Sequence, residues 1–277
     1  MCISPLTIGL NTFKCGQCTE CLIQRSQEWA FRLEQEAKDS SSGVFLTLTL
    51  DDENQIWVDT DEGQTVTTLH KPDVQKFLKR LRHAQGPLKN KQDYKEKLRY
   101  FLCGEYGETT QRAHYHAIIF NLKKEVIQKL DTIWNKGHIK VGDVTSKSIR
   151  YVTNYMLLKN ANHVKPQQKP FTLMSRKPIL GARYVVNNYY QHHEQKSVEL
   201  VSKTKQRRVL YNCYKRKIFT NEDLPEINAK AQEIFEQRKE EFRQKILDKY
   251  PDDPFAGEQQ ERDHRKYILN KRRKQRL

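Results

Sequence analysis

The stretch from Tyr100 to Phe120 constrains the fold of this chain more than any other, because it predicts two apolar strands joined by a polar loop. We expect the strands at Tyr100–Glu105 and His114–Phe120. Successive side chains of a strand face opposite ways, so His114 and His116 share one face of the hairpin. The stretch therefore predicts a sheet with two imidazoles side by side.

Glu105 ends the first strand, nine residues before His114. A hairpin would bring its carboxylate beside both imidazoles. Two neutral imidazoles and a carboxylate form a three-ligand site for a divalent cation and leave positions open for a substrate oxygen. The alternative is a hairpin whose histidines only decorate a solvent-exposed face. The neighbouring glutamate favours the metal site.

The flanking sequence predicts further elements from its apolar spacing. The segments Asp51–Gly63 and Asn160–Gly181 have the composition of loops. Helices are expected at Leu22–Lys38, Lys71–Ala84, Lys124–Trp134, Ser146–Lys159 and Leu224–Tyr250, and strands at Val44–Leu50 and His138–Val144.

Two tyrosines in the predicted helix at Ser146–Lys159 lie four residues apart. Tyr151 and Tyr155 are therefore one turn apart on the same face, and Lys159 extends this stripe by another turn. An aromatic pair at this spacing packs in a core more often than it takes part in catalysis. The metal site predicted upstream favours a catalytic role here.

The segment Ala182–Gln191 interleaves three tyrosines with two asparagines. Such aromatic rings either stack on nucleic-acid bases or line a sheet, and the sequence does not separate the two. His192 and His193 follow without a partner at ligand spacing, which predicts a solvated pair.

Four of the six cysteines lie near the amino end: Cys15, Cys18 and Cys21 form a C-x2-C-x2-C pattern, and Cys2 precedes them. Cysteines this close together are poor disulfide partners but good chelators. The pattern predicts a structural zinc site of four thiolates. An iron–sulfur cluster and a set of reduced free thiols are the alternatives. Cys103 is expected to be buried in its strand.

The formal charge of +16, from 50 lysines and arginines against 34 acidic residues, favours polyanionic partners. No apolar run approaches 18 residues, and the first residues lack the pattern of a signal peptide. Membrane insertion is therefore not expected, which leaves nucleic acid as the predicted partner. Candidate DNA-binding residues are Lys76, Lys79, Arg80, Arg112, Arg150 and Arg176.

A divalent metal and a tyrosine together can cleave a phosphodiester without water. The metal withdraws charge from the phosphate while the phenol oxygen attacks it in line. Because the bond energy is kept in a phosphotyrosine, the step is reversible, and a second tyrosine would let two transfers alternate. The phenol titrates near pH 10 in model peptides, so a cation such as Lys159 would have to assist it.

Three motifs in this order resemble those of the HUH-type replication initiators of rolling-circle elements. They are FLTLTL at Phe45–Leu50, the paired histidines at His114–His116, and YVTNY at Tyr151–Tyr155. The resemblance is closest to the initiators of small single-stranded DNA phages of the microvirus group, of the gokushovirus kind. MCISP, CGQCTEC, WAFRLEQE, FLCGEYG and PFTLMSR are also similar to that group. The resemblance covers about residues 1–190.

This resemblance implies an α+β fold with a central antiparallel sheet flanked by helices, similar to RRM domains. It implies Mg or Mn held by His114, His116 and Glu105, with Tyr151 and Tyr155 as nucleophiles. The implied reaction is nicking of a phage origin with a 5′-phosphotyrosyl intermediate, a 3′ hydroxyl that primes synthesis, and rejoining of the displaced strand. Asn154 stands where related motifs often carry lysine, so Lys159 becomes the expected assisting cation.

The resemblance further implies single-stranded DNA, a host helicase and a host DNA polymerase as partners in the host bacterial cytoplasm. The chain has no P-loop motor of its own. Three segments are expected: residues 1–43 with the cysteines and a helix, residues 44–195 as the endonuclease domain, and residues 196–277 as a basic, largely helical extension. A transposase or relaxase of the same chemistry and a zinc-stabilised nucleic-acid-binding protein without catalysis are the rival functions.

Overall fold

The computed structural model describes residues 2, 4–9, 11–88, 97–107, 110–154, 163–201 and 207–274. The chain divides into two compact units: one is Leu22–Arg183, and the other combines Met1–Cys21 with Tyr184–Leu277. Each unit is described by itself below. The expected division at residues 43 and 195 stays a prediction.

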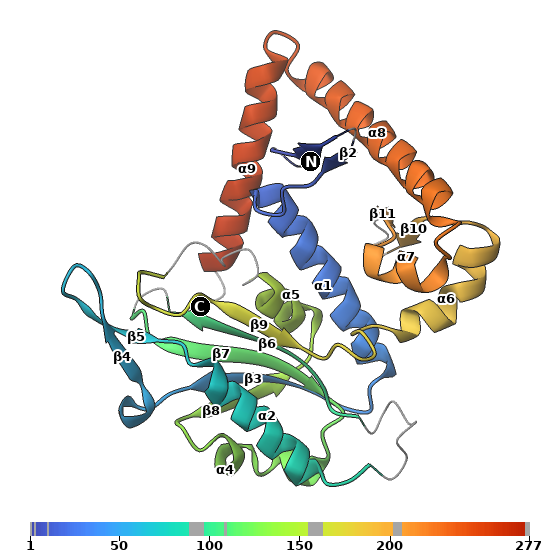
Figure 1. Cartoon of the computed structure of the whole chain (residues 1–277). Coiled ribbons are helices and arrows are strands. Elements are labelled where there is room, and N and C mark those ends of the chain that lie inside the picture. Colours follow the sequence, from blue (N-terminus) through green and yellow to red (C-terminus); the bar gives the residue numbers. More distant parts are fainter. Residues whose placement is uncertain are drawn as a thin grey trace. The chain divides into compact units, whose positions relative to one another are not determined.

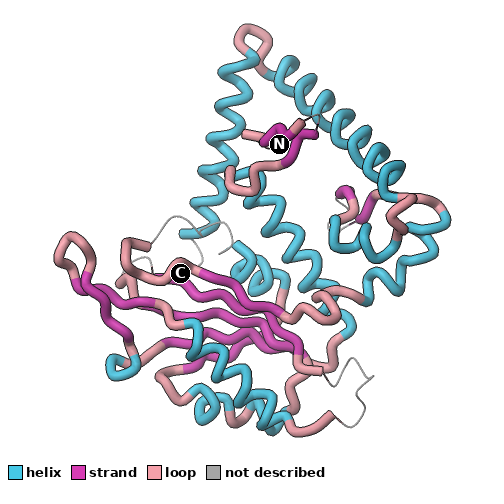
Figure 2. The backbone as a smooth tube through the Cα atoms, in the orientation of Figure 1, coloured by secondary structure: helices cyan, strands magenta, loops and turns pink. Residues whose placement is uncertain are grey.

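The Leu22–Arg183 unit is built on a five-stranded antiparallel sheet with the order β8-β3-β7-β6-β9. Figures 1 and 2 show this sheet at the centre of the unit. The prediction of an α+β fold with a central antiparallel sheet is confirmed. The strands are β3 (Gly43–Thr49), β6 (Arg99–Tyr106), β7 (Ala113–Phe120), β8 (Ile139–Asp143) and β9 (Phe171–Met174).

One face of the sheet is covered by α2 (Lys71–Gln85), α3 (Lys124–Ile127) and α4 (Leu130–Trp134). Apolar residues recur in α2 at helical spacing, and they bury against the strands. Phe77 packs edge-on against Trp134 with ring centroids 5.5 Å apart. This face holds the larger core, which fixes the alternation of the strands.

The opposite face is covered by α1 (Thr19–Asp39) and α5 (Ser146–Asn154). Its core consists of Leu33, Phe101, Cys103, Ile118, Phe120, Ile149, Val152 and Leu180. The expected burial of Cys103 is confirmed, since 1% of its surface is exposed. His114 and His116 alternate with the core residues of β7 on this same face.

A buried ion pair fastens α1 to the sheet. The carboxylate of Glu36 accepts a hydrogen bond from Arg99 Nε on β6 at 2.8 Å. Its second oxygen accepts the backbone N–H of Gly181 at 2.7 Å. Because both charged side chains are almost completely buried, each depends on the other for its neutralisation.

Several expectations for loops and helices were wrong. The expected loop at Asp51–Gly63 contains a short 3-10 helix (Asp52–Asn54) and strand β4 (Ile56–Asp59), which pairs with β5 (Thr65–Thr68). The expected loop at Asn160–Gly181 contains β9. Four-residue strands surrounded by charged residues and prolines give too short an alternation to be recognised.

The expected helix at Lys124–Trp134 is two short helices, α3 and α4. They are separated at Lys129, where φ of −106° and ψ of 11° leave the helical region. Apolar spacing predicts which side chains bury here but does not show the break, because the buried face continues across it.

The second unit is mainly helical, and its predicted long helix is α8. The elements are β1 (Leu6–Ile8), β2 (Asn11–Phe13), α6 (Arg183–Glu194, whose first residue belongs to the sheet unit), β10 (Glu199–Val201), β11 (Arg207–Val209), α7 (Asn212–Ile218), α8 (Leu224–Lys249) and α9 (Pro254–Lys274). The helical character expected for the basic carboxyl-terminal extension agrees with α8 and α9.

The tyrosine-rich segment forms α6 and not a sheet strand. His192 is also not a solvated residue, since only 1% of its surface is exposed. Its Nε2 lies 2.9 Å from the hydroxyl of Tyr184 and its Nδ1 lies 2.8 Å from the carbonyl of Ser197. Tyr184 and His192 are eight residues apart, which brings them to the same face only in a helix.

Within the described part of the chain, no helix has the length and apolar character needed to cross a membrane.

Candidate metal and nucleophile site

The β6–β7 hairpin brings Glu105 and the two histidines together as predicted. Glu105 is the register partner of His114, and His116 follows two residues later on the same face. A single carboxylate oxygen, Oε1 of Glu105, lies 2.6 Å from Nε2 of His114 and 3.0 Å from Nε2 of His116. The three side chains are well buried, so neighbouring protein atoms and not solvent fix their positions.

The outer nitrogen of each imidazole is held by the protein. Nδ1 of His114 lies 3.1 Å from the backbone carbonyl of Arg112, which can only accept, so this nitrogen carries a proton. Nδ1 of His116 lies 3.1 Å from the hydroxyl of Thr47 on β3. With Nδ1 protonated, each ring directs the lone pair of Nε2 toward Glu105. This is the arrangement found when histidine binds a metal.

Tyr151 extends from α5 to the same site. Its hydroxyl lies 3.4 Å from Nε2 of His116, and the two rings meet edge-on with centroids 5.0 Å apart. Phe45 stacks on the ring of His116 and meets Tyr151 edge-on. The helix is fixed by Ile149 and Val152, which bury in the core on this face. The phenol is therefore held at the edge of the ligand group.

The charges of the three ligands are coupled. Burial alone would raise the pKa of the Glu105 carboxyl, but hydrogen bonds with both histidines lower it below its ordinary value. Burial lowers the pKa of His116. Burial also opposes protonation of His114, but its hydrogen bond to the carboxylate raises the pKa of His114. Without a metal, a proton on His114 balances the carboxylate, and a bound cation would replace that proton.

The donor set fits a divalent cation. The ligand atoms of Glu105, His114 and His116 all lie within 4.8 Å of one another. One carboxylate oxygen faces two Nε2 atoms, so either a proton or a cation must separate their lone pairs. Three protein ligands of mixed nitrogen and oxygen type are common in metal sites that keep positions open for substrate.

Two of the predicted catalytic residues, Tyr155 and Lys159, lie outside the described residues. Helix α5 is described to Asn154, whose side-chain oxygen lies 3.2 Å from the hydroxyl of Ser26 on α1.

Thr47 and Phe45 contact the site but had no role in the sequence interpretation, although both lie in the FLTLTL motif. Their signal is the alternation of that strand, which places every second residue on the histidine face. The register pairs Thr47 with His116 and Phe45 with Ile118.

The predicted DNA-binding residues on α2 divide into two kinds. Lys76 and Lys79 are exposed. The guanidinium of Arg80 donates to the backbone carbonyls of Ile133 and Trp134, at 2.7 Å and 3.0 Å. It therefore caps the last turn of α4 and has a structural contact of its own.

Two further candidates for DNA binding differ in their surroundings. Arg150 on α5 is exposed, whereas Arg112 is half-buried. The Arg112 guanidinium donates to the carboxylate of Asp52 at 2.6 Å and to the carbonyl of Leu50 at 3.1 Å. These contacts fix the loop before β7, next to the carbonyl that holds His114.

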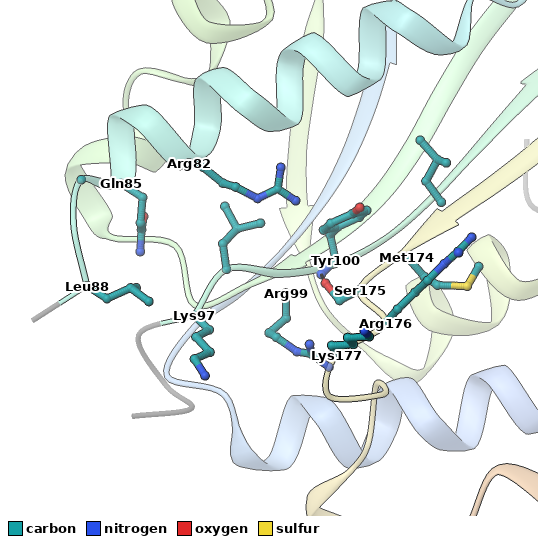
Figure 3. A pocket seen from close by; sticks show the side chains of 13 residues that line it. Arg82, Gln85, Leu88, Lys97, Arg99, Tyr100, Met174, Ser175, Arg176 and Lys177 are labelled. Carbon is teal, nitrogen blue, oxygen red and sulfur yellow. Dashed lines mark hydrogen bonds between the residues drawn. The ribbon is translucent and has the colours of Figure 1, made fainter. Parts of the chain in front are cut away.

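Arg176 lies on a basic pocket of about 610 Å³ at the other end of β6 from Glu105. Figure 3 shows the basic side chains Arg82, Lys97, Arg176 and Lys177 around its opening. The guanidinium of Arg82 lies over the ring of Tyr100, 5.6 Å from its centroid. The structure does not bring this pocket together with the ligand group.

The four amino-terminal cysteines do come together, with sulfur atoms within 4.8 Å of one another. They belong to the unit that contains Met1–Cys21. Backbone hydrogen bonds from Cys18 and Gln17 lower the pKa of the Cys15 thiol, whereas burial raises the pKa of Cys21 to about 12.

Residues 43–160 match a family model of phage-type replication-associated proteins, described by the name of its member ORF2. The matched segment runs from the start of β3 through α5 and contains Glu105, both histidines and Tyr151.

The chain is also similar to three curated phage proteins. It is 27% identical to replication-associated protein VP4 of Bdellovibrio phage phiMH2K, over 70% of this chain and 69% of that protein. It is 26% identical to replication-associated protein ORF2 of Spiroplasma virus 4, over 68% of this chain and 61% of that protein. For replication-associated protein ORF4 of Chlamydia phage 1 the identity is 27%, over 51% and 37%. These matches confirm the predicted resemblance to phage replication proteins. No solved structure matches the chain.

Proposed function

We propose that this relative of phage replication-associated proteins is a metal-dependent endonuclease that nicks single-stranded DNA to start rolling-circle replication. The observation that carries the proposal is the position of the Tyr151 hydroxyl, 3.4 Å from Nε2 of His116 in the ligand group. A phosphate bound at that group would lie within reach of a nucleophile on a packed helix. Such positioning supplies much of the rate enhancement in phosphoryl transfer.

Glu105, His114 and His116 would hold Mg or Mn. When bound, the ion would withdraw charge from the scissile phosphate and neutralise the charge that develops during attack. Thr47 and the Arg112 carbonyl keep the Nε2 atoms directed inward, so the chain supplies preformed ligands.

In the proposed reaction the phenol oxygen of Tyr151 attacks the phosphorus and the bond to the 3′ oxygen breaks. The phosphate stays on the 5′ oxygen of the downstream nucleotide as a phosphotyrosine. The phenol loses its proton, and the departing 3′ oxygen gains one and becomes the primer hydroxyl. Because a phenol has a pKa of about 10 in model peptides, a cation must favour its ionised form.

We assign that assistance to Lys159 and the second transfer, which rejoins the displaced strand, to Tyr155. Both assignments depend on the sequence spacing of Tyr151, Tyr155 and Lys159. Tyr151 is the preferred nucleophile for the first cut.

We further propose that exposed basic residues guide the DNA strand, among them Lys76, Lys79, Arg150 and Arg176. Arg80 and Arg112 are weaker candidates, because their guanidinium groups already bind carbonyls or a carboxylate of the protein. A host helicase and a host DNA polymerase would complete replication in the host bacterium.

The test is manganese-dependent nicking of an origin stem-loop oligonucleotide, followed by peptide mapping of the covalent adduct. We expect Tyr151→Phe to abolish the adduct at residue 151 and the Tyr151→Phe, Tyr155→Phe double variant to abolish nicking. Tyr190→Phe is a matched control, since the side chain of Tyr190 is largely exposed.

Cleavage that persists in the double variant, or that needs no metal, would overturn the proposed mechanism. DNA binding without any nicking by the wild-type protein would favour the non-catalytic alternative. An adduct at residue 155 alone would reverse the assigned order of the tyrosines.

A further inference from the structure

We propose that Cys2, Cys15, Cys18 and Cys21 bind one structural zinc ion that holds the amino-terminal segment in its fold. All four are free thiols, and their sulfur atoms converge on one point. The cluster is separate from the Glu105–His114–His116 group and takes no part in the proposed nicking reaction. The inference therefore stands independently of the proposed function.

The distances between sulfur atoms fit one tetrahedral ion. Zinc–sulfur bonds of about 2.3 Å place the corners of a tetrahedron about 3.8 Å apart. Sγ of Cys15 lies 4.0 Å from Sγ of Cys21, and Sγ of Cys18 lies 3.9 Å from Sγ of Cys2. A disulfide needs a separation of about 2.05 Å, so neither pair is a disulfide.

Backbone N–H groups are directed at the sulfur atoms. The N–H of Cys18 donates to Sγ of Cys15 at 3.3 Å, and the N–H of Cys15 donates to Sγ of Cys2 at 3.3 Å. Gly16 has a φ of +72°, a conformation that favours glycine, and it makes the turn between the two donors. Such donors stabilise a thiolate that binds a metal.

Four thiolates select a soft or borderline ion, which leaves zinc or iron. A four-iron cluster binds each thiolate to a different iron atom, so its cysteine sulfurs must surround a whole cluster. Sulfur atoms that all lie within 4.8 Å of one another surround a single ion. A closed set of four protein ligands without an open position is typical of structural zinc and not of a catalytic site.

The segment needs such an ion because it has little core. Its hairpin consists of two three-residue strands, β1 and β2. The apolar side chains Leu6, Ile8 and Phe13 are 57%, 67% and 51% exposed. An isolated two-stranded hairpin is marginally stable at best. Cys2 precedes the hairpin, Cys15 follows it, and Cys21 lies in the first turn of α1, so one ion would fasten both ends of the hairpin to the helix.

The test begins with elemental analysis of the wild-type protein purified without added metal, for which we expect one zinc per chain. Replacing zinc by cobalt should give the thiolate-to-cobalt absorption of a tetrahedral sulfur site. Cys15→Ser and Cys18→Ser should each lose the ion. Cys213→Ser, a cysteine of the same unit outside the cluster, should keep it.

A second measurement does not depend on the variants folding. Chelating the wild-type protein should increase hydrogen exchange of the described residues between 4 and 18, and adding back one equivalent of zinc should restore their protection. No bound metal, iron with inorganic sulfide, or zinc retained in both Cys15→Ser and Cys18→Ser would overturn the proposal. Nicking is not a readout, so failure of the endonuclease proposal would leave this result unchanged.

Discussion

Replacing Thr47 by valine tests how the metal ligands are oriented. The Thr47 hydroxyl lies 3.1 Å from Nδ1 of His116 on the neighbouring strand. Valine has almost the same shape but no hydrogen-bonding oxygen. The imidazole would then lose the contact that keeps its proton on Nδ1 and its lone pair on Nε2.

The magnitude follows from burial. The side chain of His116 is only 3% exposed, so water has little access to replace the hydroxyl. A buried polar group left without a partner costs about 1–3 kcal/mol. Since each 1.4 kcal/mol corresponds to about a tenfold change in affinity, we expect the Kd for manganese to rise by about 10- to 100-fold, the usual effect of losing such a supporting contact.

The assay is isothermal titration of metal-free protein with manganese, with urea unfolding of the same samples as a check on stability. Thr49→Val is the matched control. It lies two residues along the same face of β3, but its hydroxyl donates to the carbonyl of His138. An unchanged Kd in Thr47→Val, or an equal loss in both variants, would refute the proposed orientation by Thr47.

Two further predictions concern the stability of the sheet unit. Glu36→Gln should lower the free energy of unfolding by about 3–5 kcal/mol, because it leaves the Arg99 cation buried without its counter-charge; urea titration would show this, and a midpoint shift no larger than in the less buried Glu34→Gln would contradict it. Gly137→Ala should destabilise the unit by about 2–4 kcal/mol, since φ is +142° and a Cβ would lie 2.6 Å from the backbone carbonyl oxygen of Thr49. Gly142→Ala is its control, with the nearest atom at 3.7 Å, and equal thermal midpoints for the two variants would show that the clash is relieved.

The site was predictable from sequence to the extent that strand geometry determines it. Alternation places His114 and His116 on one face, and the short loop after Glu105 leaves few registers for the hairpin. The helical spacing in α5 likewise identifies Tyr151 as a residue close to the sheet. These inferences hold because they depend on local geometry alone.

What sequence could not show depends on long-range contacts. Arg80 looks like a free surface cation on a helix, but its partners are carbonyls more than fifty residues away. His192 looks solvated until α6 brings Tyr184 to it. Strand β9 is four residues long and is recognisable only by its pairing with β6. Residue patterns carry no information about which distant segment supplies a partner.

The order of the strands has a consequence for how the protein withstands local opening. The histidines are on β7, the middle strand of five, and Glu105 is on β6 beside it, whereas the outer positions belong to β8 and β9. Peripheral strands separate more readily than interior ones in native-state fluctuations. The rim of the sheet can therefore loosen as a DNA strand enters or leaves while the three ligands keep their spacing.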